Sequence, residues 1–292
     1  MNTVTAFASA KLNLTLSVGK KMGDFHPLSS FVVPISLCDR VEMTLSEENS
    51  VTIINEKDIF GNCLPTVMQE NNTVMKILQR FQSVFDTKER FCVRIKKDIP
   101  CGAGLGGSSA DAGAVLRVLC GIYDKNHSDV LEIASSVGKD VPFALNSKPC
   151  IMEGFGERLT FCDEIKDKFT LVNISTPNST AEIFSAYDNM GAKELSTSNT
   201  WELYDFYRKN PLEKGLIANA SQNPESLFIN DLTNAARSVN PEMSEVIRKL
   251  EKENYNVFMS GSGSTLFIRG YYATELKNQG FQNVLNVETV SL

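Results

Sequence analysis

Hydrophobic and polar residues alternate along the first segment of the chain. Apolar side chains occupy the even positions from 4 to 16, and polar side chains occupy the odd positions from 5 to 17 except at Phe7. A period of two predicts a β-strand with one buried face. Lys11 and Asn13 are then expected to lie on the same polar face, one repeat apart.

Further strands are expected in the first half of the chain. A turn over residues 20–28 leads into apolar and alternating segments. Pro34 interrupts the first of these, since proline has no backbone N–H to donate to a ladder. The predicted strands cover 31–37, 39–45, 51–54 and 90–99.

Three segments of the first half have apolar residues at helical spacing. The segment 71–85 is expected to be capped by Asn71 or Asn72. The segment 108–123 follows a glycine-rich stretch. The segment 128–138 is expected to have Ser128 as its cap and Gly138 as its stop.

Beyond about residue 150 the pattern changes and a second domain is expected. A helix is predicted over 240–254, with Pro241 at its first position. Residues 186–226 are polar and weakly periodic, and are assigned only loosely to helices and loops. Strands are predicted over 149–161, 168–175, 255–260 and 264–270. Strand clusters alternating with helices indicate an α+β fold.

Composition narrows the possible functions. A chain of 292 residues with 42% hydrophobic and 22% charged residues can form one large or two smaller globular domains. A net charge of -6 argues against a broad nucleic-acid or anionic-membrane surface. The seven cysteines include no CxxC pair, which disfavours a disulfide framework or a zinc site. No signal peptide or apolar run of about 18 residues is present, so a cytoplasmic location is expected.

The densest candidate for chemistry is the glycine-rich stretch PCGAGLGGSSADAGAVL at 100–116. Glycines let the backbone approach phosphate oxygens, and the free N–H groups of a following helix favour anions. Ser108 and Ser109 can reach a phosphate or a bound Mg²⁺. The alternative is a flexible turn with Ser108 as an ordinary cap. Four glycines in six residues, between a strand and a helix, favour phosphate binding.

The common phosphate-binding loops do not match this stretch. Gly102, Gly104 and Gly107 satisfy GxGxxG, but no strand ending in an acidic residue follows about 20 residues later, as a dinucleotide site requires. No Lys follows Gly107, which excludes a Walker A loop. A protein-kinase glycine loop opens a hairpin, whereas this one opens a helix.

Three motifs in order resemble those of the GHMP kinase family, whose members phosphorylate small alcohols. They are AKLNLTL (10–16), the central glycine motif, and MSGSGSTLF (259–267). The resemblance implies a two-domain GHMP kinase fold. A ribosomal-protein-S5-like, ATP-binding domain is expected over 1–157 and an α/β-sandwich domain over 158–292, with the acceptor cleft between them.

Other motifs resemble the members of the family whose acceptor carries a cytidine diphosphate group. MGDFH (22–26), GKDVPF (138–143), GFGE (154–157) and the Asn-Asp-Leu at 230–232 are similar to motifs of that branch. The chain departs from them at four places: Phe25 replaces Tyr, Lys139 replaces a small residue, the glycine and serine pattern at 106–110 is shifted, and Ser264 replaces Pro.

The resemblance implies roles for two catalytic residues. By itself, Asp140 is more simply interpreted as the cap of a short helix that contains Pro142. The family match implies instead that Asp140 is the base that accepts the hydroxyl proton. It also implies that Lys11, otherwise a strand lysine, lies beside Asp140 and keeps that carboxylate ionised.

The remaining assignments concern the two substrates. Phe25 and Phe184 are expected to hold cytosine, although Phe184 can equally be an ordinary helix-packing residue. His127 is expected to lie at the surface. The other predicted acceptor contacts are Asn13, His26, Gly261 and Gly263. The predicted ATP contacts are Asn72, Lys97, Pro100, Gly102, Ala103, Gly104, Leu105, Gly106, Gly107, Ser108 and Ser109. Mg²⁺ is expected to arrive with ATP, without dedicated protein ligands.

Three alternatives remain open at the level of sequence. The chain can be a GHMP kinase for homoserine or mevalonate, although those members lack the GDFH-type cytosine contacts. It can be a non-catalytic nucleotide-binding homologue, but Lys11 and Asp140 are both present. An NAD(P) oxidoreductase is disfavoured because no strand that ends in an acidic residue follows the glycine motif. The oligomeric state does not follow from the sequence.

Overall fold

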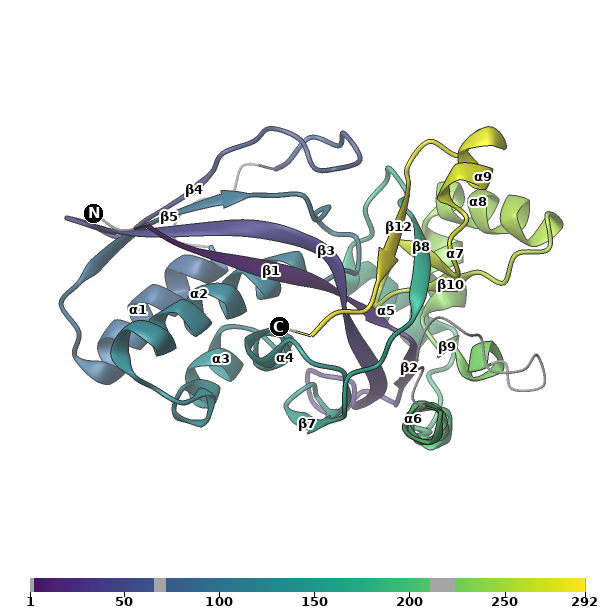
Figure 1. Ribbon diagram of the computed structural model, residues 1–292. Helices are drawn as coiled ribbons and strands as arrows, with labels where there is room; N and C mark the ends of the chain where they lie inside the picture. The colour runs from purple at the N-terminus through teal and green to yellow at the C-terminus, as the bar shows by residue number, and fades with distance from the viewer. Residues whose placement is uncertain (1–2, 66–71, 211–223, 292) are drawn as a thin grey trace.

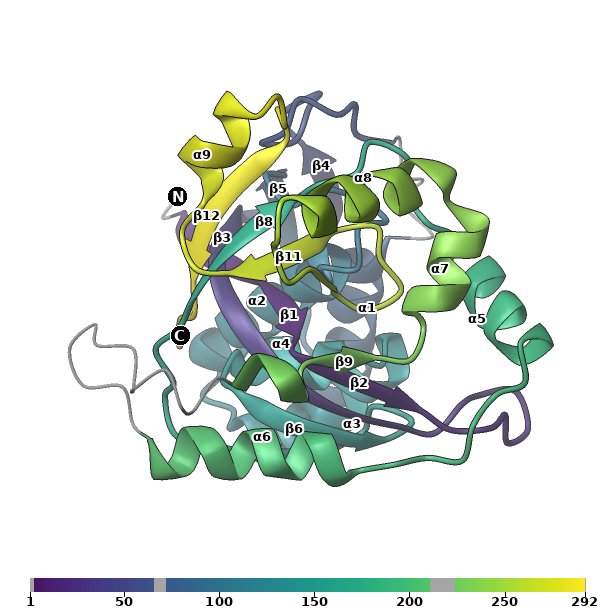
Figure 2. The same ribbon diagram turned by 90° about the vertical axis from the view of Figure 1, so that its right-hand side faces the viewer.

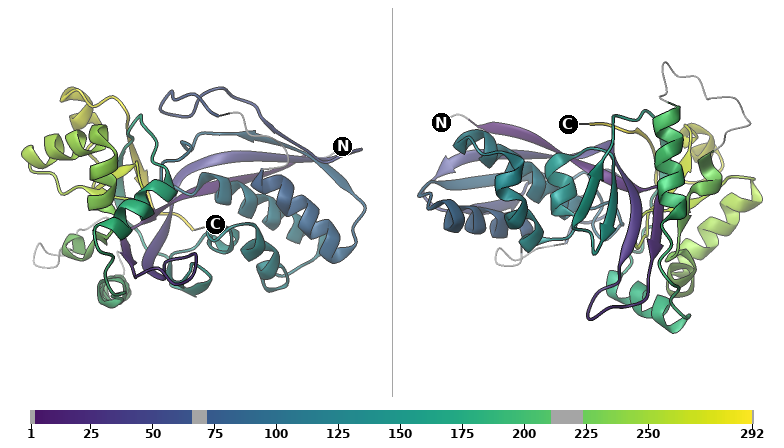
Figure 3. Two further views of the ribbon diagram at one scale, coloured as in Figure 1. Left: turned by 180° about the vertical axis from the view of Figure 1, so that it is seen from behind. Right: turned by 90° about the horizontal axis from the view of Figure 1, so that it is seen from below.

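The computed structural model describes residues 3–65, 72–210 and 224–291. Within them, the larger sheet is mixed and is built mainly from the N-terminal half. Helices α1–α4 cover one face of this sheet (Figure 1), as Figure 3 shows again from behind. The strands are β1 (Val4–Asn13), β2 (Thr15–Val18), β3 (Leu28–Ser46), β4 (Ser50–Ile53), β5 (Arg90–Lys96), β6 (Cys150–Gly154), β7 (Arg158–Phe161) and β9 (Ile229–Asn230). The helices are α1 (Thr73–Phe85), α2 (Gly107–Tyr123), α3 (Leu131–Val137) and α4 (Val141–Asn146).

The smaller sheet is antiparallel and belongs to the C-terminal half, with the order β10-β11-β8-β12. Its strands are β8 (Lys168–Val172), β10 (Phe258–Met259), β11 (Leu266–Arg269) and β12 (Val284–Glu288). Figure 2 shows this sheet beside the C-terminal helices. The helices of this half are α5 (Thr180–Asn189), α6 (Ser198–Lys209), α7 (Thr233–Val239), α8 (Pro241–Lys252) and α9 (Ala273–Asn278).

Alternation along β8 divides its side chains between two cores. Phe169 and Leu171 join the core of the larger sheet, whereas Val172 packs in the second core with residues of α8 such as Ile247. The smaller sheet is therefore buried on both faces and connects the two halves. The expected boundary between 157 and 158 falls inside the β6–β7 hairpin, and the exact bounds of the two domains remain a prediction.

The α+β prediction and most of the expected elements are confirmed, with three corrections. The strand predicted over 149–161 is the hairpin of β6 and β7. The strands predicted at 31–37 and 39–45 form one strand, β3. Pro34 is tolerated there because it pairs with Lys11, next to a register shift that already interrupts the ladder. The helix predicted over 128–138 begins with a 3₁₀ turn at 127–130. Asn126, and not Ser128, makes its capping box with Asp129.

Part of the loosely assigned region 186–226 lies outside the described residues, and so does Asn71. The rest contains α6 and the end of α5. The helix predicted over 240–254 is confirmed as α8, with Pro241 first and the Asn240 side chain accepting from the backbone N–H of Met243.

Candidate active site

From Ser9 onward the predicted polar face of the first strand is buried, which corrects the expectation of one buried face, whereas Thr5 and Phe7 are exposed. Lys11 and Asn13 are 8% and 7% exposed, and Thr15 and Ser17 are buried as well. The physical reason is that the glycine-rich stretch and the C-terminal half cover this face. The backbone N–H of Lys11 donates to the carbonyl oxygen of Leu105 at 3.0 Å, so the glycine loop is attached directly to β1.

The glycine loop has a backbone that favours glycine. Gly102, Gly104 and Gly106 have φ values of 65°, 74° and 73°, in the left-handed region where a Cβ is strained. Gly106 is the N-cap of α2 and no side chain caps this helix, so the first N–H groups are left without a capping side chain. Ser108 and Ser109 lie in its first turn and neither is buried. This arrangement suits an anion such as a phosphate.

The glycine loop is joined to the C-terminal glycine motif. The Ser260 hydroxyl donates to the carbonyl oxygen of Gly104 at 3.1 Å and accepts from the backbone N–H of Asn13 at 3.2 Å. The backbone N–H of Thr265 donates to the carbonyl oxygen of Ala103 at 3.1 Å. Loops more than 150 residues apart in the sequence therefore form one unit with β1.

Gly104 lies where these loops meet. A Cβ atom there would lie 2.1 Å from the carbonyl oxygen of Ser260 and 2.9 Å from that of Gly263. We expect Gly104→Ala to lower the free energy of unfolding by more than the roughly 1–2 kcal/mol that a left-handed alanine costs. The variant should also bind both substrates more weakly. Urea unfolding and the two KM values measure this.

Gly121, in the interior of α2, offers a matched control. Nothing lies within 4 Å of a Cβ built there, and its φ is helical. Gly121→Ala should stabilise the protein by about 0.5–1 kcal/mol. If both substitutions change stability and kinetics alike, the contact between the two loops does not organise the site.

Lys11 and Asp140 both lie close to Gly106. A Cβ atom built on Gly106 would lie 3.2 Å from Cγ of Lys11 and 4.0 Å from Oδ2 of Asp140. The Lys11 ammonium donates to the carbonyl oxygen of Gly104 at 2.7 Å and to Oδ1 of Asn13. Burial lowers the pKa of Lys11, while the negative charge of Asp140 opposes the shift. Lys11, Asn13 and Asp140 thus lie close to the glycine loop, and the roles that the family resemblance implies for them stay a prediction.

Asp140 is the N-cap residue of α4, but its side chain makes no capping hydrogen bond. The simpler interpretation, in which the carboxylate serves as a helix cap, is therefore wrong for the side chain. The carboxylate is partly exposed and is free to face a ligand next to the loop.

Lys97 is bound beneath the loop. Its ammonium pairs with Asp39, and with Asp111 at 2.7 Å, and all three side chains are buried. The ammonium nitrogen of Lys97 would lie 3.3 Å from a Cβ atom built on Gly107. Burial raises the pKa of Asp111 to about 7, although the charge of Lys97 opposes this shift.

Asn72 caps α1: its side-chain oxygen accepts from the backbone N–H of Val74 at 2.8 Å. A role for Lys97 or Asn72 in the adenine pocket stays a prediction. Pro100, Ala103 and Leu105 are buried parts of the loop.

The predicted acceptor side contains several aromatic rings. Phe25 is 54% exposed and its ring lies 6.1 Å from that of Phe155. His26 contacts Phe184 at 4.9 Å between ring centroids and bonds to Asp188 at 2.8 Å. Phe25 thus contacts Phe155, whereas Phe184 contacts His26. The binding of cytosine by Phe25 and Phe184 together stays a prediction.

Gly261 faces Lys11: a Cβ atom there would lie 3.0 Å from the Lys11 ammonium nitrogen. A Cβ on Gly263 would lie 2.5 Å from Nδ2 of Asn178. Both glycines therefore lie against polar side chains. His127 contacts Asn146 at 3.2 Å between Nδ1 and Oδ1.

Sequence reasoning missed the residues that hold the third motif in place. Asn230 donates to the carbonyl oxygens of Met259 and Gly261, at 2.8 Å each. Asn178 donates to the carbonyl oxygen of Ser262 at 2.7 Å. The Asn-Asp-Leu motif pointed to Asn230 without giving it a role, whereas no pattern in the sequence points to Asn178.

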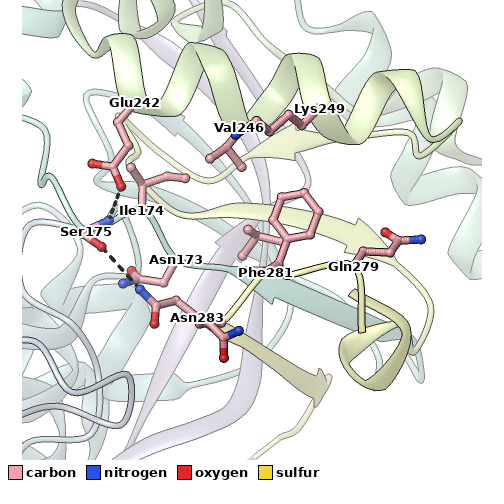
Figure 4. A pocket seen from close by; sticks show the side chains of 12 residues that line it. Asn173, Ile174, Ser175, Glu242, Val246, Lys249, Gln279, Phe281 and Asn283 are labelled. Carbon is pink, nitrogen blue, oxygen red and sulfur yellow. Dashed lines mark hydrogen bonds between the residues drawn. The ribbon is translucent and has the colours of Figure 1, made fainter. Parts of the chain in front are cut away.

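A separate hollow of about 270 Å³ lies in the C-terminal half (Figure 4). Residues 172–175 and 279–283 line it together with Glu242, Val246 and Lys249 of α8. None of the predicted site residues belongs to it. The catalytic assignments thus concern the glycine-loop region alone.

Comparison with known proteins identifies the family. Residues 72–148 match the GHMP kinases N terminal domain, and residues 203–275 match the GHMP kinases C terminal domain. The chain therefore belongs to the GHMP kinase family, and it is a phosphotransferase with the two-domain fold of that family.

Its relatives narrow the family further. The chain is 33% identical over 275 residues to the 4-diphosphocytidyl-2-C-methyl-D-erythritol kinase of Thermodesulfovibrio yellowstonii, covering 90% of this chain and 88% of that protein. It is 31% identical to the kinase of the same name from Wolbachia sp. subsp. Brugia malayi, with 91% and 89% covered. A crystal structure of 4-(cytidine 5'-diphospho)-2C-methyl-D-erythritol kinase shares the fold, with a TM-score of 0.76 and 22% identity over 99% of this chain and 100% of that one.

Among the described residues, no helix is both long enough and apolar enough to cross a lipid bilayer.

Proposed function

We propose that this kinase transfers the γ-phosphoryl group of ATP to the 2-hydroxyl of 4-diphosphocytidyl-2-C-methyl-D-erythritol, a step of non-mevalonate isoprenoid biosynthesis in the cytoplasm. The observation that carries the proposal is the grouping of Lys11, Asn13 and Asp140 around Gly106. The relatives at 33% and 31% identity supply the identity of the acceptor.

The proposed chemistry assigns one task to each group. Asp140 accepts the hydroxyl proton as the alcohol oxygen attacks the γ-phosphorus, and ADP leaves. The Lys11 ammonium offsets negative charge near the reacting oxygen, and Asn13 orients that ammonium through its Oδ1. The glycine loop and the start of α2 hold the phosphates through backbone N–H groups.

Mg²⁺ is proposed to arrive bound to ATP. Within the described residues, no group of three or more His, Cys, Asp or Glu side chains is placed to hold a metal ion. The hydroxyls of Ser108 and Ser109, in the first turn of α2, would suit an oxygen-preferring cation that accompanies the phosphates. Mg²⁺ would neutralise charge on the transferred group.

The direct test is a coupled ADP-release assay with three acceptors: 4-diphosphocytidyl-2-C-methyl-D-erythritol, homoserine and mevalonate. We expect turnover with the cytidyl acceptor only. Turnover with homoserine or mevalonate alone would favour another small-alcohol kinase of the family. Binding of ATP without turnover of any acceptor would favour a non-catalytic homologue.

Replacement of Phe184 should show whether its ring stacks on cytosine or packs in the core. If its ring face holds cytosine, Phe184→Ala should weaken the acceptor about 5- to 150-fold, since base–aromatic stacking contributes about 1–3 kcal/mol. The KM for ATP should hardly change. Phe7→Ala, at a 52% exposed ring on β1, is the control. A lower melting temperature with an unchanged acceptor KM would identify Phe184 as a packing residue.

His26 should have a different signature. Its ring packs on Phe184, its Nε2 bonds to Asp188 and its side chain is 7% exposed, so in this proposal the polar contact with cytosine falls to Nδ1, the other ring nitrogen. The preference for cytosine over uracil acceptors should narrow in His26→Ala, whereas Phe184→Ala should weaken both acceptors alike.

A further inference from the structure

Lys139 is a cation at the acceptor side that the proposed chemistry does not use. Its ammonium lies 5.1 Å from the centroid of the Phe25 ring. Within the described part of the chain, the Lys139 ammonium makes no ion pair or hydrogen bond besides this cation–π contact. Such a contact at an exposed ring is worth only about 0.5–1 kcal/mol. The ammonium is therefore held loosely and remains available to an anion.

The position of Lys139 connects two parts of the site. Its backbone immediately precedes Asp140, about 3.8 Å away between Cα atoms, while its ammonium reaches Phe25. A Cβ atom on Gly156 would lie 3.3 Å from Cβ of Lys139. The first carbon of this exposed side chain therefore lies next to the β6–β7 turn, which also carries Phe155 beside Phe25.

The chemistry of the proposed acceptor matches this span. That molecule has a base at one end, the reacting alcohol at the other and a negatively charged diphosphate between them. If the base lies at Phe25 and the alcohol at Asp140, the diphosphate lies along the stretch that the Lys139 side chain covers. The chain has a net charge of -6, and a cation at this place would favour an anionic acceptor against that overall charge.

We propose that Lys139 is a specificity-determining residue that binds the diphosphate of the acceptor. This inference rests on the proposed function. In the free protein the ammonium covers one face of the Phe25 ring. When the acceptor binds, it moves to the diphosphate and leaves that ring face open to the base. Lys139 thereby distinguishes an alcohol linked to a nucleoside diphosphate from an uncharged polyol.

The test compares Lys139→Met, Lys139→Arg and Lys148→Met. Lys148 is exposed and lies just beyond the other end of α4, so its replacement makes the same charge change away from Phe25. A charge-assisted hydrogen bond is worth about 1.5–3 kcal/mol, which corresponds to a rise of about 10- to 150-fold in the acceptor KM of Lys139→Met. Its kcat and its KM for ATP should stay near the wild-type values. Lys139→Arg should retain most of the acceptor affinity, and Lys148→Met should match the wild type.

The outcomes are distinguishable. If the wild type does not phosphorylate the cytidyl acceptor, the proposed function fails before any variant is compared. If the wild type is active and Lys139→Met has the acceptor KM of Lys148→Met, the role of Lys139 is refuted and the proposed function stands. A rise confined to the KM for ATP would also refute it. Added salt should raise the acceptor KM of the wild type more than that of Lys139→Met, and equal salt dependence would contradict the ionic contact.

Discussion

Asp140→Asn should lower turnover by about 10²–10⁴-fold, the usual contribution of a general base. Asparagine has almost the same shape but cannot accept the hydroxyl proton. The structure makes the test clean, because the Asp140 side chain makes no capping hydrogen bond to α4. The variant should therefore unfold at the wild-type urea concentration and bind ATP normally. Steady-state ADP release, urea unfolding and an ATP-dependent thermal shift measure the three quantities.

A matched control is Asp124→Asn, at the C-terminal end of α2, far along the helix from the glycine loop. It removes one carboxylate and keeps the left-handed backbone, which asparagine tolerates. Its turnover should equal that of the wild type. Turnover of Asp140→Asn within a fewfold of this control would show that the proton leaves by another route.

The second large effect should come from Lys97→Met. This substitution leaves Asp39 and Asp111 buried together without their shared cation. Breaking a buried pair by removing one partner typically costs about 3–5 kcal/mol. Because the ammonium lies beneath the start of α2, the glycine loop should loosen and ATP should bind more weakly. Urea unfolding and ATP titration measure both changes.

The neighbouring Lys96 provides the comparison. It is half exposed and pairs with Asp98 at 3.1 Å, and an exposed pair contributes about 0–1 kcal/mol. Lys96→Met should therefore change stability little. A Lys97→Met protein as stable as Lys96→Met, but with weakened ATP binding, would contradict the structural role and support direct contact of Lys97 with adenine.

Local pattern predicted most of the elements because periodicity reports how one segment is buried. The amphipathic spacing of α1 and α8 and the Pro241 start each depend on residues within a few turns of one another. One error occurred where a distant segment decides the outcome: Pro34 did not end a strand, because β1 shifts register opposite to it. Another error was local, since Asn126 and not Ser128 forms the capping box with Asp129, three residues later.

For the site, the sequence by itself determined the glycine density of the loop, the helix behind it and the motif residues Lys11, Asn13 and Asp140. A glycine permits a left-handed φ, and the first N–H groups of a helix have no partner within that helix. Both properties depend only on residues close together in the sequence. Only the tertiary structure decided that the polar face of β1 is buried beneath two loops, that Lys97 is shared by two carboxylates, and that Lys139 rests on Phe25. These contacts join residues far apart in the chain. Their energies depend on which surfaces meet after folding, and a periodic pattern within one segment carries no record of that.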